Sequence, residues 1–158
     1  MTQSHNHWIG LAISAAKEGL ISQKGGPFGA VIVRKNTLIA SAYNTVTTSN
    51  DPTAHAEINA IRGACQQLNT YDLSGCILYS SCEPCPMCLG AILWARLKAV
   101  YYCANRDDAS SAGFDDCGFY EEFEKPQDER KLPCQQLSHP DRLAPFQYWQ
   151  EIPDKKLY

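Results

Sequence analysis

The chain has 158 residues, of which 44% are hydrophobic and 20% are charged, so it is long enough to bury the core of one globular domain. Its formal net charge of −3 argues against a large polyanion as partner, because nucleic-acid-binding proteins usually present a basic face. No apolar run reaches the roughly 18 residues that a membrane-spanning helix requires. We therefore expect neither a nucleic acid nor a membrane as partner.

Two features bear on the compartment. Residues 1–8 are polar and lack the basic-then-apolar layout of a secretory signal, so we expect a cytoplasmic protein. In that compartment the eight cysteines are more often metal ligands, reactive groups or reduced core thiols than disulfides. Their spacing has to decide between those uses.

The N-terminal part of the chain has the pattern of a helix followed by a hairpin. Apolar residues recur at helical spacing from His5 to Ile21, which predicts a first helix. Gly25-Gly26-Pro27 ends that helix with a turn. Phe28–Val33 and Leu38–Tyr43 are short apolar runs separated by a polar turn, which is typical of two neighbouring strands.

The middle of the chain alternates between helices and strands. Residues 44–50 form a polar loop, after which Asp51-Pro52 suits the start of a helix that runs to about Leu68. Cys76–Ser81 is expected to be a buried strand. Pro84 opens a third helix through Arg96, and Ala99–Ala104 is the next strand.

The pattern weakens beyond Asn105. Residues 107–129 hold nine acidic side chains and one lysine, which favours a solvated loop and helix over a site for an acidic partner. Leu132–Leu137 is the candidate for a last strand, and Pro145–Gln150 begins a short helical tail. This order of elements predicts an α/β protein, a single domain over residues 1–158 with helices on both faces of one mixed sheet.

Two short clusters carry the chemistry. His55-Ala56-Glu57 falls in the opening turn of the second helix, and Pro84-Cys85-Pro86-Met87-Cys88 falls in the opening turn of the third. A Cys-x-x-Cys pair at a helix start points two sulfurs toward one side, and the helix dipole favours their thiolate form. Zinc prefers such thiolates together with an imidazole in tetrahedral geometry.

His55, Cys85 and Cys88 make three protein ligands rather than four. Structural zinc sites are usually closed by a fourth protein ligand, whereas catalytic sites leave that position to water. A bound zinc ion lowers the pKa of that water, and Glu57 is the adjacent carboxylate that can take its proton. The pattern predicts a catalytic centre with one zinc ion per chain and Glu57 as the proton carrier.

Other uses of these residues have to be weighed. A lone Cys-x-x-Cys also suits a thioredoxin-like redox pair or two core thiols, but its combination with the histidine and glutamate favours zinc. Cys82 as a fourth ligand would close the site; since Pro84 starts the helix after it, we expect Cys82 to point elsewhere and not to bind metal. The remaining cysteines are expected to be reduced core or surface thiols: Cys65, Cys76, Cys103, Cys117 and Cys134.

H-x-E followed by P-C-x-x-C is the signature of zinc-dependent nucleobase deaminases, and the chain resembles the guanine-deaminating branch of that cytidine-deaminase-like superfamily. The resemblance covers nearly the whole chain and is carried by GGPFGAVIV (25–33), TTSNDPTAHAE (47–57), SCEPCPMCLGAI (81–92), WAR (94–96), AGFDD (112–116) and the closing APFQYWQ and KKLY. It implies a three-layer α/β/α fold around a five-stranded mixed sheet. It also implies hydrolysis of guanine to xanthine and ammonia.

The same resemblance assigns roles to further residues. Glu57 would pass protons from water to the ring and to the departing amine, with Asp116 as a second proton donor. The small purine base would be bound by a wider set: Phe28, Asn44, Ala56, Trp94, Asp116 and Tyr158. On the residues alone, each position also has a structural explanation. Phe28 and Trp94 could be core aromatics, and Asn44 could be a turn residue. Asp116 could be one more acid of the acidic stretch, and Tyr158 could belong to a frayed terminus.

The resemblance also implies a homodimer. In this branch the C-terminal segment, residues 145–158 or so, is exchanged between two subunits, so that Tyr158 of each chain would complete the site of the other. The aromatic residues Phe146, Tyr148 and Trp149 could anchor that segment on a partner's surface.

Three rival functions remain on the sequence. A tRNA adenosine deaminase shares both clusters but needs a basic approach surface, against which the acidic stretch 107–129 argues. A cytosine or cytidine deaminase fits the C-terminal motifs less well. A non-catalytic partner subunit that keeps the zinc fold would be expected to lack the proton carrier, and Glu57 is present.

Overall fold

The computed structural model describes residues 3–114 and 116–158, with the side chain of Cys117 left out. Asp115, which belongs to the AGFDD motif, lies outside the described residues, as do Met1 and Thr2. The chain divides into two compact units, Met1–Cys117 and Gly118–Tyr158.

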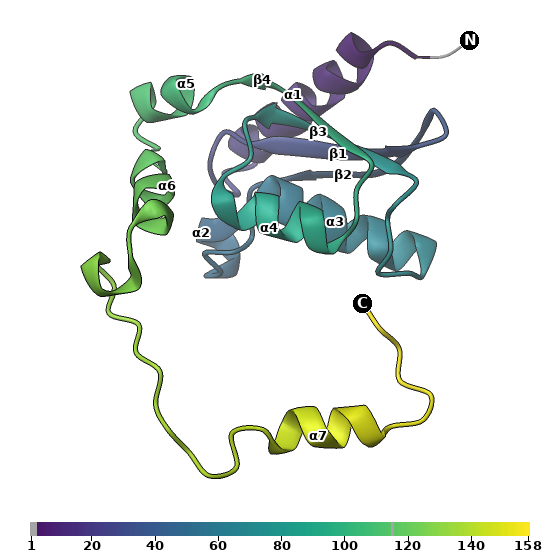
Figure 1. Cartoon of the computed structure of the whole chain (residues 1–158). Coiled ribbons are helices and arrows are strands. Elements are labelled where there is room, and N and C mark those ends of the chain that lie inside the picture. The colour runs from purple at the N-terminus through teal and green to yellow at the C-terminus, as the bar shows by residue number, and fades with distance from the viewer. Residues whose placement is uncertain (1–2, 115) are drawn as a thin grey trace. The chain divides into compact units, whose positions relative to one another are not determined.

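The first unit is built on a mixed sheet of four strands in the order β2-β1-β3-β4 (Figure 1). β1 (Gly29–Arg34) pairs antiparallel with β2 (Thr37–Tyr43) on one side and with β3 (Cys76–Cys82) on the other. β4 (Ala99–Ala104) lies parallel to β3. The parallel pair places the C-terminal ends of β3 and β4 at the same edge of the sheet.

Helices cover both faces of this sheet because β1 sends alternate buried side chains to opposite sides. Val31 packs with α1 (His5–Ile21) on one face, and Ile32 packs in the larger core under α3 (Ala56–Leu68) on the other. α4 (Pro86–Trp94) lies beside α3 (Figure 1). This confirms the expected three-layer α/β/α arrangement and the first helix as predicted.

Two helices begin later than the sequence predicts. Asp51 does not cap α3, because its carboxylate accepts hydrogen bonds from the backbone N–H (2.8 Å) and hydroxyl (2.7 Å) of Thr53 in a local turn. The helix therefore begins at Ala56. α4 begins at Pro86 rather than Pro84, because Pro86 disfavours the helical conformation at Cys85, which is extended and serves as the N-cap residue. Both shifts place the predicted ligands directly at helix starts.

The expected five-stranded sheet is wrong in one respect: the described residues contain four strands, and Leu132–Leu137 forms none. Pro133 removes a backbone donor from that segment. Leu132 and Leu137 are both 78% exposed, so no buried face selects a strand there. A smaller difference is α2 (Val46–Ser49), a short helix where the sequence predicts a loop.

The remaining elements follow β4. α5 (Arg106–Ser111) belongs to the first unit, and α6 (Cys117–Glu124) begins at the boundary between the units. A 3-10 turn (Gln127–Glu129) and α7 (Ala144–Glu151) follow, the latter confirming the predicted helical tail. None of the side chains described between residues 118 and 158 is buried. No helix in the described part of the chain combines the length and apolar character needed to cross a membrane.

Candidate metal centre

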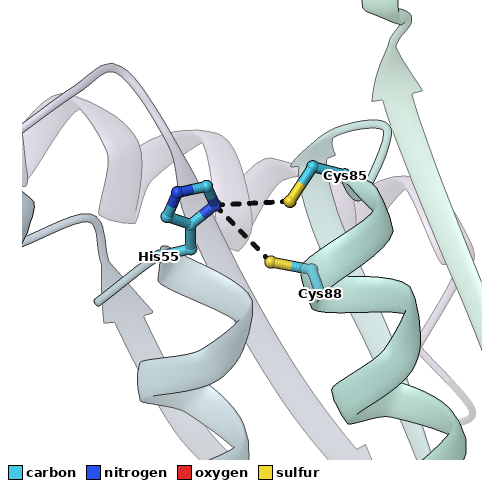
Figure 2. Close-up of side chains that lie close together, drawn as sticks. All are labelled: His55, Cys85 and Cys88. Atoms are coloured by element: carbon cyan, nitrogen blue, oxygen red, sulfur yellow. Dashed lines mark hydrogen bonds between the residues drawn. The ribbon is translucent and has the colours of Figure 1, made fainter. Parts of the chain in front are cut away.

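The site forms where two helices begin. His55 is the N-cap residue of α3 and Cys85 is the N-cap residue of α4, and both have the extended backbone conformation of that position. Neither side chain caps its own helix, so both remain directed beyond the helix end. Cys88 follows in the first turn of α4. Figure 2 shows the imidazole of His55 facing the sulfurs of Cys85 and Cys88.

The three side chains lie at the spacing of zinc ligands. The Nδ1 atom of His55 lies 3.6 Å from the Sγ atom of Cys85 and 3.6 Å from that of Cys88. All three ligand atoms lie within 4.8 Å of one another. Tetrahedral zinc with ordinary Zn–N and Zn–S bonds separates its nitrogen and sulfur ligands by about 3.6 Å. The donor set therefore fits a zinc ion without movement of the backbone.

The ligand side chains perturb one another's pKa values. A hydrogen bond with Cys88 lowers the pKa of the Cys85 thiol to about 4, and the same contact together with burial raises the pKa of Cys88. The hydrogen bond with Cys85 is also the main cause that raises the pKa of His55. Cys85 is thus a thiolate at neutral pH, the form in which cysteine binds zinc.

Cys82 lies outside this cluster, as the sequence predicts. Its Sγ atom is 3.6 Å from the carbonyl oxygen of Asn105, to which the thiol donates. Burial raises the pKa of the Cys82 thiol to about 11, so it stays protonated at neutral pH. Its sulfur is directed to that carbonyl and does not belong to the group of three ligand atoms that lie within 4.8 Å of one another.

Glu57 is buried in the first turn of α3, only 5% exposed. Desolvation is the main cause that raises the pKa of its carboxyl group. The hydroxyl of Ser80, itself 1% exposed, donates a hydrogen bond to Glu57 Oε1 at 3.4 Å. A buried carboxyl group whose pKa is raised is better suited than a solvated one to take a proton and return it.

Ser80 is a contact that the sequence analysis missed. It lies in β3, where a polar residue in a buried strand is the one available signal, since most buried strand positions are apolar. The sequence does not indicate that its hydroxyl faces Glu57, because that contact depends on how α3 packs against β3.

Asn44 is held in one orientation by the backbone around it. Its Oδ1 atom accepts hydrogen bonds from the backbone N–H groups of Gly26 (3.2 Å) and Val46 (3.1 Å). A Cβ atom at Gly25 would lie 2.4 Å from that oxygen, so this position requires glycine. Because the amide oxygen accepts both of these bonds, the orientation of the amide group, and with it that of the Nδ2 donor, is set by the backbone.

Phe28, Ala56 and Asp116 also belong to the first unit. Phe28 is half-buried and meets Phe114 edge to face, with ring centroids 4.9 Å apart. Ala56 is fully buried at the first position of α3. Burial, followed by the charge of Cys85, raises the pKa of the half-buried Asp116, so its carboxyl group lies within the field of the ligand cluster.

Neither Trp94 nor Tyr158 is buried. Trp94 ends α4 and is 68% exposed, roughly 12 Å along the helix axis from the ligand end. Tyr158 belongs to the second unit and is 69% exposed. Their purine-binding roles stay predictions.

Comparison with known proteins places this geometry in context. Residues 2–104 match the family described as the cytidine and deoxycytidylate deaminase zinc-binding region. The guanine deaminase of Bacillus subtilis is 54% identical over 98% of this chain and 99% of its own, and the crystal structure of guanine deaminase from that organism gives a TM-score of 0.96 with 99% of both chains covered. A guanine deaminase structure from Nitrosomonas europaea is 32% identical, with a TM-score of 0.69 over 73% of this chain and 66% of that one.

A second activity occurs among the relatives. The tRNA-specific adenosine deaminase of Aquifex aeolicus is 42% identical over 62% of this chain and 64% of its own. The match to a zinc-binding family and the three-residue cluster together support one zinc ion per chain.

We predict that Cys85→Ala loses most of the bound zinc, because two remaining ligands hold the ion too weakly. Cys82→Ala is the matched control: it removes a neighbouring thiol that donates to a carbonyl, and it should keep about one zinc per chain. Elemental analysis of the purified variants decides. Zinc retained by Cys85→Ala and lost by Cys82→Ala would reverse the ligand assignment.

Proposed function

The chain belongs to the cytidine and deoxycytidylate deaminase zinc-binding family, and on that basis we propose that it is a zinc-dependent guanine deaminase. The reaction is the hydrolysis of guanine to xanthine and ammonia. The observation that carries this choice is the similarity to the Bacillus subtilis guanine deaminase across both units of the chain. The Aquifex aeolicus tRNA-specific adenosine deaminase covers only 62% of the chain.

In the proposed mechanism, His55, Cys85 and Cys88 hold the zinc ion, which when bound supplies a Lewis acid that makes water nucleophilic near neutral pH. Glu57 carries the protons. It takes one proton from the attacking water as the new C–O bond forms at C2 of guanine, and delivers it to a ring nitrogen. It then takes the second proton from the hydroxyl now on C2, and delivers it to the departing amine as the C2 carbonyl forms. The bond between C2 and the amino nitrogen then breaks, and ammonia leaves. Asp116 is a second candidate for the last proton delivery.

The purine would be held by groups that the first unit presents around the ligand cluster. The Nδ2 group of Asn44 donates to an acceptor on the ring, and the edge of Phe28 supports its face. The backbone N–H at Ala56, at the start of α3, favours the negative charge that develops on the substrate. Asp116 accepts from the ring N–H groups. Trp94 and Tyr158 complete the pocket in the assembled protein.

We further propose a homodimer with exchanged C-terminal segments. Residues 118–158 contain no buried side chain among those described, and several large apolar groups are exposed: Phe119, Phe123, Phe146, Tyr148 and Leu157. A segment that buries no core of its own gains stability by covering another surface. Exchange of an identical element between subunits supplies that surface at low cost. The two units would then act as one deaminase domain over residues 1–158.

We propose a cytoplasmic location from the state of the cysteines. The cysteines that the structure describes carry free thiols, among them the buried Cys76 and Cys82. Free thiols persist where the compartment is reducing.

Glu57→Ala should keep zinc and fold but lose nearly all turnover. Removal of a general acid–base group typically costs about 10² to 10⁴-fold in rate, and here one group serves several transfers. Steady-state ammonia release, with elemental analysis as the control for zinc, measures the effect. Retention of more than about a tenth of the wild-type rate would remove Glu57 from the proton-carrier role.

Guanine should be deaminated at least about a hundredfold faster than adenine, adenosine, cytosine or cytidine, because buried polar groups are left unpaired by the wrong ring. Ammonia assays on the purified protein, with a tRNA anticodon stem-loop as a further substrate, test this directly. Guanine turnover should change little between low and high salt, since a neutral base releases no counterions. Efficient tRNA deamination that falls steeply with salt would instead establish the adenosine deaminase alternative.

Deletion of residues 155–158 should lower guanine turnover while zinc content and fold remain, because Tyr158 would no longer reach the purine. Chains carrying Glu57→Ala and tail-deleted chains are each expected to have little activity on their own. Refolded together, they should recover about a quarter of wild-type activity, since half of the dimers are mixed and each mixed dimer has one complete site.

The same mixture separates exchange from a tail that packs on its own subunit. Without exchange, every site in a mixed dimer carries one defect, so no activity returns. Native mass spectrometry of the refolded sample verifies that mixed dimers form. An inactive mixture that contains them rules out the exchanged tail.

A further inference from the structure

We infer that Arg106 is a positioning residue of this site. Its ion pair with Glu83 fastens α5 to the turn that carries Cys85, and the fastened helix holds Asp116 beside the ligand cluster. The inference deepens the proposed function, on which it rests for the statement that Asp116 contacts the purine.

Glu83 and Arg106 meet through two separate contacts. The guanidinium Nη2 atom of Arg106 pairs with Glu83 Oε1, and the backbone N–H of Arg106 donates to Glu83 Oε2 at 3.3 Å. The Glu83 side chain is 16% exposed and that of Arg106 is 38% exposed. A charge-assisted contact that is partly shielded from water and engages both carboxylate oxygens fixes orientation far better than an exposed ion pair.

The turn before α4 is tied to the start of α5 by further bonds. The backbone N–H of Glu83 donates to the carbonyl of Ala104 at 2.9 Å, and the Cys82 thiol lies 3.6 Å from the carbonyl of Asn105. Asn105 itself caps α5 through reciprocal bonds with Asp108. The first turn of α5 is therefore joined to the residues directly before Cys85.

The far end of the α5 segment is also anchored. Gly113, with φ of +91°, turns the chain after the helix, and Phe114 then packs edge to face on Phe28. Asp116 follows two residues later. A segment held at Arg106 and again at Phe114 fixes where Asp116 can lie.

Arg106 also balances the charges on either side of it. Its positive charge acts on Asp116 as well as on Glu83, and the two carboxylates repel one another. Without the guanidinium, Glu83 would be a partly buried charge with no cation, next to a second carboxylate. The uncompensated repulsion between the two carboxylates would then move α5 and Asp116 away from the cluster. The backbone hydrogen bond from Glu83 to Ala104 would keep the turn that carries Cys85 in place.

The test uses Arg106→Met, which keeps the length of the side chain and removes the charge. Arg62→Met is the matched control, because Arg62 belongs to α3 and forms a more exposed ion pair with Asp51 at 3.6 Å. Zinc content should stay near that of the wild type in both. Hydrogen–deuterium exchange should become faster in residues 106–111 of Arg106→Met and stay unchanged there in Arg62→Met.

Kinetics distinguish a positioning role from a merely structural one. Arg106→Met should lower kcat/KM for guanine between about ten- and a hundredfold, as displaced substrate contacts do. In an Asp116→Asn background the same substitution should cost no more than about twofold, because the residue through which Arg106 acts is already disabled. Equal losses in the two backgrounds, or unchanged exchange in α5, overturn the inference.

Milder variants keep the inference testable if Arg106→Met does not fold. Arg106→Lys retains the charge, and Glu83→Gln retains the shape of the carboxylate, so both should give smaller losses that again disappear in the Asp116→Asn background. Losses that persist there contradict the positioning role. A wild-type protein that leaves guanine untouched contradicts the proposed function instead, and the exchange measurement still decides whether Arg106 fastens α5.

Discussion

The site depends on two helix N-termini that meet at one edge of the sheet. An N-cap residue has extended backbone geometry, so its side chain projects past the helix end rather than along its side. His55 and Cys85 occupy these positions in α3 and α4, which brings residues thirty apart in sequence to 3.6 Å. The unpaired N–H groups of both helix ends also favour the thiolate of Cys85 and negative charge on a ligand. Ligand geometry and electrostatics therefore have one origin.

The rest of the first unit keeps those helix ends in place by close packing. A Cβ atom at Gly29 would lie 2.2 Å from the carbonyl of Ala12, so α1 rests directly on the backbone of β1. Gly25 makes the same kind of room for Asn44, whose side chain then fixes the turn before β1. Where backbones approach this closely, small shifts are expensive because interiors are packed like crystals. The hairpin consequently holds Asn44, a proposed purine-binding residue, as part of a rigid layer.

The sequence predicts what is local and misses what depends on tertiary contacts. His55, Glu57, Cys85 and Cys88 could be assigned because their spacing at helix starts already encodes their direction. The sequence places the helix starts too early, at Asp51 and Pro84. The helices begin at Ala56 and Pro86, because a second possible start lies a few residues after the first in each segment. The hydroxyl of Ser80 on Glu57 and the pairing of Glu83 with Arg106 join separate elements, and no spacing rule connects them. The strand expected at 132–137 is absent because Pro133 removes a backbone donor and both leucines are exposed, so no partner strand or buried face stabilises it.

The family match ends between the ligand cluster and some of the residues proposed to bind the purine. Residues 2–104 contain the ligand cluster and Glu57, which a deaminase needs whatever base it accepts. Arg106, Asp116 and the C-terminal segment lie beyond that region, so the proposed purine contacts are shared between the two: Phe28, Asn44, Ala56 and Trp94 inside it, Asp116 and Tyr158 beyond it. In the proposed function, selectivity for the base requires that the purine contacts beyond residue 104 be held in a fixed position relative to the ligand cluster and Glu57. The contact between Glu83, inside the family region, and Arg106, outside it, is one that does so. Because hydrolysis demands that water and purine approach a common point, a misplaced recognition group slows the chemistry as well as binding.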